Sequence, residues 1–222
     1  DEYIYRAALT HKILMGKHSL NTACMLSEFR MGSCKADLAI LNGTATVYEI
    51  KSERDSLVRL TNQIENYKKV FANVYVIAGE THVRSVLDMT PKDVGVMCLS
   101  RRHQISTLRE ALGSPERICT TTVFESLRSA EARSILVELG VAIPEVPNTK
   151  LHRAVRECFR QLDPKDVHFA MVKILKRTRN LMPLSNLVDR LPQSLHAAAL
   201  SIQVRRSDHD RLIEAVETPL DA

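Results

Sequence analysis

The chain of 222 residues contains no tryptophan, and aromatic residues make up only 5% of it. Extensive stacking of nucleic-acid bases on aromatic side chains is therefore not expected. No apolar run reaches the length of a transmembrane helix, and no signal-peptide pattern opens the chain. The five cysteines are odd in number and form no C-x-x-C pair, which is typical of a reducing compartment. These absences favour a cytoplasmic protein without membrane contact or a disulfide framework.

Several common catalytic motifs are also missing. The eight histidines form neither an H-x-x-x-H nor an H-E-x-x-H pattern, so a zinc site is not expected. There is no Walker A phosphate-binding loop and no G-x-S-x-G nucleophile motif. The sequence therefore gives no indication of ATP use.

What the sequence does contain is an uneven distribution of charge. Its composition, 45% hydrophobic and 26% charged residues, is ordinary for a globular protein, and its net charge is +5. Residues 150–179 hold nine basic and three acidic residues, so this segment carries +6 and the rest is near −1. A local excess of this kind indicates a local contact with a polyanion.

Hydrophobic periodicity predicts an α/β fold with two parts. The first part, a core over 1–105, begins with a helix over 3–15 and continues as an antiparallel meander of three strands (24–30, 35–41 and 44–51). An amphipathic helix over 56–71, with Asp55 as its N-cap, leads to a strand over 74–78. A helical region (106–222) with basic helices follows. The remaining predictions are a helix over 82–89, a strand over 94–99 and helices over 125–139, 150–162, 164–180, 193–204 and 208–217.

The meander brings charged residues together if its strand register is right. A two-residue turn at 32–33 places Glu28 opposite Asp37. A two-residue loop at 42–43 would send Glu49 to the other face, whereas a three-residue loop over 42–44 places it opposite Asp37. We predict the three-residue loop, with Gly43 in a left-handed conformation. Glu28, Asp37, Glu49 and Lys51 then share one face, with Arg30 and Lys35 at its edge.

Three carboxylates on one face would repel one another, and a hard divalent cation relieves this repulsion. Lys51, two residues from Glu49, could orient or deprotonate a metal-bound water and offset charge in a phosphoryl transition state. The alternative is a solvated sheet face with alternating charges, which spacing alone does not exclude.

The pattern as a whole resembles the PD-(D/E)XK nuclease superfamily over roughly residues 3–100. Asp37 precedes Glu49-Ile50-Lys51 by the spacing D-x11-E-x-K, and Gln63 and Tyr67 supply the Q-x3-Y pair of the next helix. Small bacterial proteins of unassigned role share the run from Glu49 to Phe71, E-I-K-S-x-x-D-x-L-x-R-L-x-x-Q-x-x-x-Y-x-x-V-F. The resemblance implies a restriction-endonuclease-like core and Mg²⁺- or Mn²⁺-dependent hydrolysis of phosphodiester bonds.

The resemblance also implies roles for individual residues. Asp37, Glu49 and the Ile50 carbonyl would hold the metal, and Lys51 would be the catalytic lysine. Glu28 is the candidate for an additional acid, and Glu2 competes for that role from the first helix. Gln63 and Tyr67 would support the site or contact DNA, although Tyr67 is equally compatible with core packing. Asp55 is interpreted as a helix cap.

Basic helices supply a candidate DNA-binding surface. Arg153, Arg156 and Arg160 recur at i, i+3 and i+7, and Lys173, Lys176 and Arg177 form a second cluster. Such stripes can neutralise phosphates without reading sequence, although a solvated helix face has the same pattern. Lys35 and Arg30 are the corresponding candidates in the core.

The leading hypothesis is a metal-dependent DNA nuclease. A catalytically silent nucleic-acid-binding module is one alternative, and a protein-interaction component of a phage-defence or toxin–antitoxin system is another. A homodimer and a protein partner stay open as possibilities.

Overall fold

The computed structural model of the protein describes residues 2–202 and 204–218 and has an α/β fold built on one mixed sheet. The strand order follows the chain, β1-β2-β3-β4-β5-β6. The first three strands are antiparallel, β3, β4 and β5 are parallel, and β6 returns antiparallel to β5. The strands are β1 (Cys24–Met31), β2 (Cys34–Asn42), β3 (Thr44–Lys51), β4 (Asn73–Gly79), β5 (Gly95–Leu99) and β6 (Ile105–Arg109).

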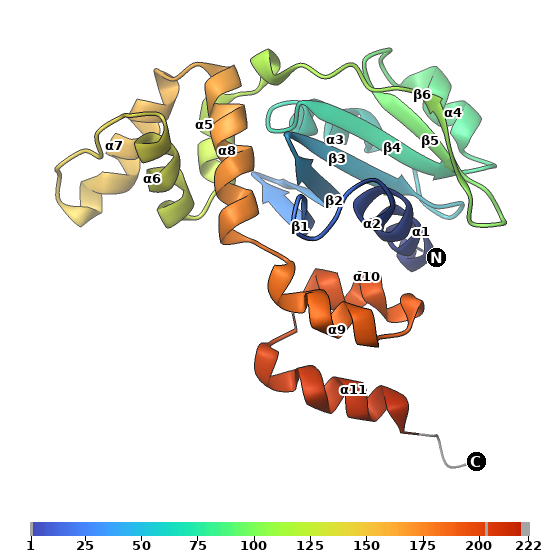
Figure 1. Cartoon of the computed structure of the whole chain (residues 1–222). Coiled ribbons are helices and arrows are strands. Elements are labelled where there is room, and N and C mark those ends of the chain that lie inside the picture. Colours follow the sequence, from blue (N-terminus) through green and yellow to red (C-terminus); the bar gives the residue numbers. More distant parts are fainter. Residues whose placement is uncertain (1, 203, 219–222) are drawn as a thin grey trace.

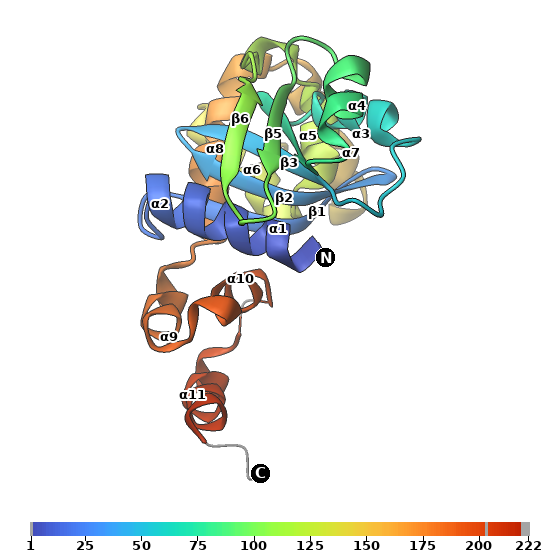
Figure 2. The same cartoon turned by 90° about the vertical axis from the view of Figure 1, so that its right-hand side faces the viewer.

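Helices cover both faces of this sheet, and α3 and α4 make the crossovers between its parallel strands (Figures 1 and 2). Helix α1 continues through a π-helical turn, Thr10–Leu14, into α2. The N-terminal and crossover helices are α1 (Glu2–Leu9), α2 (Met15–Lys17), α3 (Leu60–Tyr67) and α4 (Val83–Met89). The later ones are α5 (Thr120–Ser126), α6 (Ser129–Glu138), α7 (Asn148–Arg160), α8 (Pro164–Thr178), α9 (Ser185–Arg190), α10 (Gln193–Ile202) and α11 (His209–Glu217).

Two hydrophobic cores lie on the two faces of the sheet, because side chains alternate along each strand. On β3, Ala45 and Val47 enter the core that α3 and α5–α8 cover. Tyr48 and Ile50 enter the core beneath α1 and the C-terminal helices. Glu49 and Lys51 therefore continue the Ala45–Val47 face, which turns them towards α3.

The predicted three-residue loop between β2 and β3 is confirmed. Leu41 pairs with Ala45, and Gly43 has a φ of 70°, a conformation that costs glycine little. The ladder runs to Leu38 and Tyr48, and the same register places Asp37 opposite Glu49. The first hairpin also has the predicted register, since Ser27 pairs with Leu38 and Phe29 with Ala36 on either side of Glu28.

Three predictions about elements were wrong. The helix expected over 56–71 is confined to α3, Leu60–Tyr67. Asp55 does not cap it, because its carboxylate accepts hydrogen bonds from the Ser52 amide and hydroxyl, both at 2.7 Å. The boundary expected at residue 105 falls within β6, so the sheet extends into the region predicted to be helical.

The helices after β6 do not form a separate unit. Helices α5–α8 gather at one side of the sheet and share its core, while α9–α11 project below it (Figure 1). The predicted N-cap of α8 is confirmed, since Asp163 accepts hydrogen bonds from the Lys165 and Asp166 amides. Within the described ranges, no helix has the length and apolarity needed to span a bilayer.

Candidate active site

Asp37 and Glu49 lie where β2 and β3 separate. The regular ladder ends at Leu38 and Tyr48, and beyond it Asp37 Oδ2 accepts a hydrogen bond of 2.8 Å from the Ile50 amide. A side chain thus replaces the backbone partner that Ile50 would have in a continuous ladder. This interaction fixes the Asp37 carboxylate beside the backbone of β3.

Glu49 is the centre of a buried hydrogen-bond network. It is only 1% exposed, and its Oε1 accepts from Lys51 Nζ at 2.7 Å and from Gln63 Nε2 at 2.6 Å. Its Oε2 lies 2.5 Å from the Tyr67 hydroxyl, which is also 3.1 Å from the Lys35 carbonyl oxygen. Lys51 Nζ donates to Gln63 Oε1 as well, at 3.0 Å. Lys51 and the two residues expected to support the site, Gln63 and Tyr67, therefore all contact Glu49.

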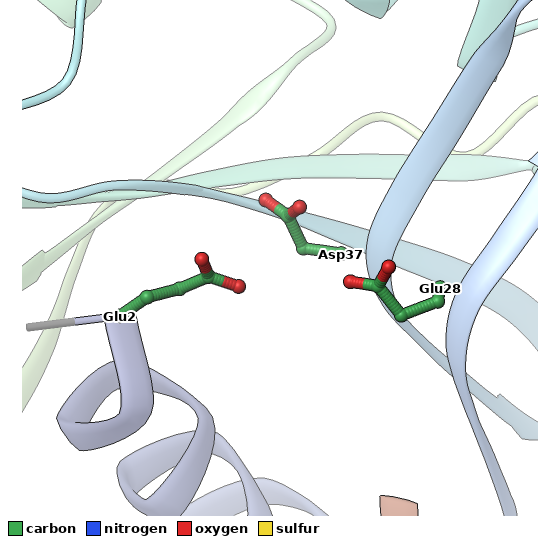
Figure 3. Close-up of side chains that lie close together, drawn as sticks. All are labelled: Glu2, Glu28 and Asp37. Carbon is green, nitrogen blue, oxygen red and sulfur yellow. The ribbon is translucent and has the colours of Figure 1, made fainter.

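A second group of carboxylates converges on the other side of Asp37 (Figure 3). One oxygen from each of Glu2, Glu28 and Asp37 lies within 4.8 Å of the others, and we call these three residues the acid cluster. Glu2 comes from the first turn of α1, whereas Glu28 and Asp37 come from adjacent strands. The sequence leaves open whether Glu28 or Glu2 is the additional acid of the site, and both residues belong to the acid cluster.

Two basic side chains compensate this cluster. Arg6, one turn after Glu2 on α1, donates 2.6 Å hydrogen bonds to both Glu2 and Glu28. Lys35 Nζ donates to the other oxygen of Glu28. Arg30 pairs with no acid in the part of the chain that the structure describes. Most of the charge of Glu28 is therefore balanced by the protein itself.

The four residues expected on one face form two groups instead. Along β1, Leu26 and Phe29 enter the same core, so the alternation of side chains shifts by one position next to Glu28. Glu28 accommodates this shift with a φ of 57°, which is rare for a residue other than glycine. Such backbone strain costs about 1–3 kcal/mol and is concentrated at functional sites. The consequence is that Glu28 and Asp37 face Glu2, while Glu49 and Lys51 face α3.

Burial, with the neighbouring charge of Glu49 as a second cause, raises the pKa of Asp37 to about 7. The hydrogen bond from Lys35 does most to lower the pKa of Glu28, with Arg6 adding to it. Burial and the charge of Glu49 raise the pKa of Tyr67, which keeps its hydroxyl a donor to Glu49. Asp37 is thus the group of the site whose protonation changes near neutral pH.

The donor atoms fit a hard divalent cation. The acid cluster offers carboxylate oxygens alone, the ligands that Mg²⁺ and Mn²⁺ prefer. Glu49 accepts three hydrogen bonds, which leaves part of its capacity of about four lone pairs. Asp37 stands between the acid cluster and Glu49 and is the residue that both groups share.

The basic helices have the predicted bounds within two residues, but acids partner several of their side chains. Arg156 pairs with Glu125 on α5, Arg160 with Glu157, and Lys173 with Glu138 on α6. In the described ranges, Arg153, Lys176 and Arg177 have no acidic partner, and none of these six residues pairs with the acid cluster. Helix α8 meets the meander at the 42–45 hairpin, where His168 Nε2 lies 3.0 Å from Thr44 Oγ1.

Sequence reasoning missed the contribution of Arg6. The spacing of Glu2 and Arg6, four residues apart on a helix, predicts their ion pair but not the further bond to Glu28. It also missed that Asp55 fixes the turn directly after Lys51. The local signal there, a serine three residues before an aspartate, is common in turns of all kinds.

Comparison with known proteins gives a family. A family model described as bacteriophage P4 protein cII matches residues 1–198. Protein cII of Enterobacteria phage P4 is 28% identical over 158 residues, which cover 68% of this chain and 56% of that protein. This chain therefore spans a little over half the length of its curated relative. The name of that relative states no activity.

A solved structure of a protein of unknown function from Silicibacter pomeroyi is a more distant match. It has a TM-score of 0.41 and 14% identity, and the match covers 64% of this chain and 94% of that one. Similarity at this level supports no conclusion about function. The family match is different in extent, since it covers nearly all of the described residues. The chain belongs to the bacteriophage P4 protein cII family.

Proposed function

We propose that the protein is a divalent-metal-dependent nuclease that hydrolyses phosphodiester bonds in DNA. One observation carries this proposal: Asp37 is bonded to the Ile50 amide, between Glu49 and Lys51 in the chain, and Lys51, Gln63 and Tyr67 all contact Glu49. The order of helix, three-stranded meander, helix and parallel strand is compatible with a restriction-endonuclease-like core. The resemblance to the PD-(D/E)XK superfamily concerns these same residues.

In this proposal, Asp37 holds Mg²⁺ or Mn²⁺ together with Glu28, Glu2 and Glu49, and the Ile50 carbonyl completes the set. The cation would lower the pKa of a bound water and neutralise phosphate charge. Lys51 is held by Glu49 and Gln63 at a buried position, so its ammonium group is oriented before substrate arrives. Its charge is available to the transition state in a water-poor environment, where it has the greatest effect.

Cleavage of labelled DNA with Mg²⁺, with Mn²⁺ and with EDTA tests the proposal. We expect Asp37→Asn and Lys51→Met each to lower the rate by about 100-fold or more. The matched controls, Asp88→Asn and Lys92→Met, change exposed residues of the same types outside the site and should leave the rate unchanged. Cleavage that persists in EDTA, or in both site variants, would overturn the proposal.

A second function is favoured by the charge balance of the site. Arg6 and Lys35 already neutralise Glu28, and donors already occupy both oxygens of Glu49. Because side chains of the protein already balance these carboxylates, they do not require a metal ion. The alternative function is therefore binding of nucleic acid without catalysis. Titration calorimetry separates the two functions: DNA binding without any heat from Mg²⁺ or Mn²⁺ supports simple binding, whereas metal heat that Asp37→Asn removes supports the nuclease.

A further inference from the structure

The loop between β3 and α3 (residues 52–59) begins directly after Lys51 and carries two acids and two arginines. Both acids are exposed, but their carboxylates lie against neighbouring parts of the protein. Asp55 Oδ2 accepts from the Ser52 amide and hydroxyl, and the Glu53 carboxylate lies over Gly79 at the end of β4. A Cβ atom at position 79 would collide with Glu53 Oε1, so only glycine leaves room for this arrangement.

The two arginines of the loop have different surroundings. Arg54 and Arg59 are exposed, and neither has an acidic partner within the described ranges. The loop has as many acids as arginines and so carries no net charge, but both acids are in contact with other groups of the protein, whereas the arginines have no acidic partner and can bind an outside anion. Val58, next to Arg59, is 89% exposed, more than any other large apolar residue described.

The loop is also anchored, which matters for recognition because ordering a loose loop costs binding energy. The Asp55 amide donates to the Ser52 carbonyl at 3.1 Å, and His82 Nε2 lies 3.0 Å from the Asp55 carbonyl oxygen. These contacts tie the middle of the loop both to the end of β3 and to the start of α4. Arg54 and Val58 are thus presented from a fixed backbone.

The end of the 52–59 loop lies close to the candidate active site. The Gln63 amide donates to the Arg59 carbonyl at 3.0 Å, so Arg59 precedes Gln63 by one helical turn. Residues four apart on a helix are neighbours on its surface. Gln63 contacts both Lys51 and Glu49, which places the start of the Arg59 side chain one turn from the proposed reacting centre.

We propose that Arg54 and Arg59 bind the phosphates of a DNA strand on either side of the bond presented to the site. The exposed Val58 lies between them in the loop. This inference rests on the proposed nuclease function for its substrate, but it concerns binding alone. It assigns the principal backbone contact to the loop rather than to the basic helices.

The test measures binding of a fluorescein-labelled DNA duplex, and of its single strand, by anisotropy in EDTA. We expect Arg54→Ala/Arg59→Ala to weaken binding about tenfold at low salt. The slope of log Kd against log salt should fall by about one for each phosphate that an arginine no longer neutralises. Arg102→Ala/Arg205→Ala is the matched control, since both residues are exposed arginines, and it should keep the wild-type affinity and slope. The variant Arg54→Ala/Arg59→Lys should bind DNA more tightly than Arg54→Ala/Arg59→Ala, because lysine keeps the positive charge at position 59.

The outcomes separate the inference from its alternatives. Wild-type affinity and slope in the double variant would overturn it, and so would wild-type protein that shows no salt-sensitive DNA binding. Equal weakening in the control pair would also overturn it, because that result would indicate a diffuse charge effect. If the wild type binds DNA through these arginines but leaves it intact with Mg²⁺ and Mn²⁺, the nuclease proposal fails and the binding surface stands.

Discussion

Two glutamates are buried, one in the candidate site and one among the helices, and their charges are compensated differently. Glu49 is 1% exposed and Glu131 is 2% exposed. Glu131 accepts from Arg179 at 2.7 and 2.8 Å, from the Thr178 hydroxyl and from the Arg128 amide. No second carboxylate contacts it among the described residues, so α6 and the end of α8 are joined by a compensated ion pair.

Glu49 has as many partners, but Asp37 lies beside it. Burial works to raise the pKa of Glu131, yet the bonds from Arg179 and Arg128 hold that pKa below its usual range. Burial and Glu49 together raise the pKa of Asp37 to about 7. The helical region thus uses its buried acid for stability, whereas the site keeps a carboxylate that folding disfavours. Groups of that kind are concentrated where proteins bind or react.

The largest expected effect comes from breaking the compensated pair. Glu131→Ala leaves Arg179, whose side chain is only 14% exposed, without its partner, and breaking a buried pair in this way costs about 3–5 kcal/mol. Urea unfolding followed by circular dichroism measures this cost. Glu138→Ala, on the same helix, removes an ion pair with the exposed Lys173 and should cost less than about 1 kcal/mol. Equal costs for the two variants would refute the structural role given to Glu131.

The opposite behaviour is expected of Asp37. Its pKa rises from 3.8 to about 7 on folding, so the folded state binds the proton more tightly. Stability is therefore lost as the pH rises through this window. Asp37→Asn removes this dependence and should stabilise the protein by on the order of 3 kcal/mol above pH 7, with little effect near pH 4.

Thermal unfolding as a function of pH measures this difference. Asp93→Asn is the control: burial works to raise the pKa of Asp93, but bonds from Lys68 and the charge of Arg117 outweigh it and lower that pKa. That variant should lose stability at neutral pH rather than gain it. A melting temperature of Asp37→Asn at or below the wild type at pH 8 would contradict the view that folding disfavours the Asp37 carboxylate.

His168 gives the helical region a pH dependence of the opposite sign. Burial lowers its pKa to about 4, and its Nε2 accepts from the Ala45 amide at 3.3 Å. Protonation favours the unfolded state, so stability should fall by on the order of 2 kcal/mol between pH 6.5 and 4. His168→Gln keeps an acceptor but does not titrate, and it should flatten this limb of the curve. The exposed His103→Gln should not, and flattening by both would disprove the assignment.

Sequence predicted the strand register of the meander better than it predicted the elements around it. The period of two along strands, together with one glycine in the 42–44 loop, predicted the register that leads towards an alignment of Asp37 with Glu49, and the structure has this register up to Leu38 and Tyr48. The alignment of Glu28 with Asp37 was equally accessible. These predictions depend on local rules that a strand cannot easily violate.

What sequence could not predict depends on contacts between distant segments. The left-handed conformation of Glu28 moves it towards Glu2 and Arg6, and no local pattern indicates such a shift in a non-glycine residue. The bounds of α3 were missed because Asp55 bonds backwards to Ser52 instead of forwards into the helix. The boundary near residue 105 was missed because β6 is a short, mostly exposed edge strand with little hydrophobic signal.

The smallest expected effects on stability come from two aspartates that make similar hydrogen bonds in different parts of the protein. Asp163 caps α8 by accepting from the Lys165 and Asp166 amides, and Asp55 accepts from the Ser52 amide beside Lys51. Either change to alanine should cost about 1 kcal/mol of stability. Only Asp55→Ala should also lower the rate of DNA cleavage per folded molecule, because it releases the turn that follows Lys51. Equal rates of cleavage by the two variants would show that the 52–59 loop does not support catalysis. Only the raised pKa of Asp37 would then distinguish the candidate site from the helical region.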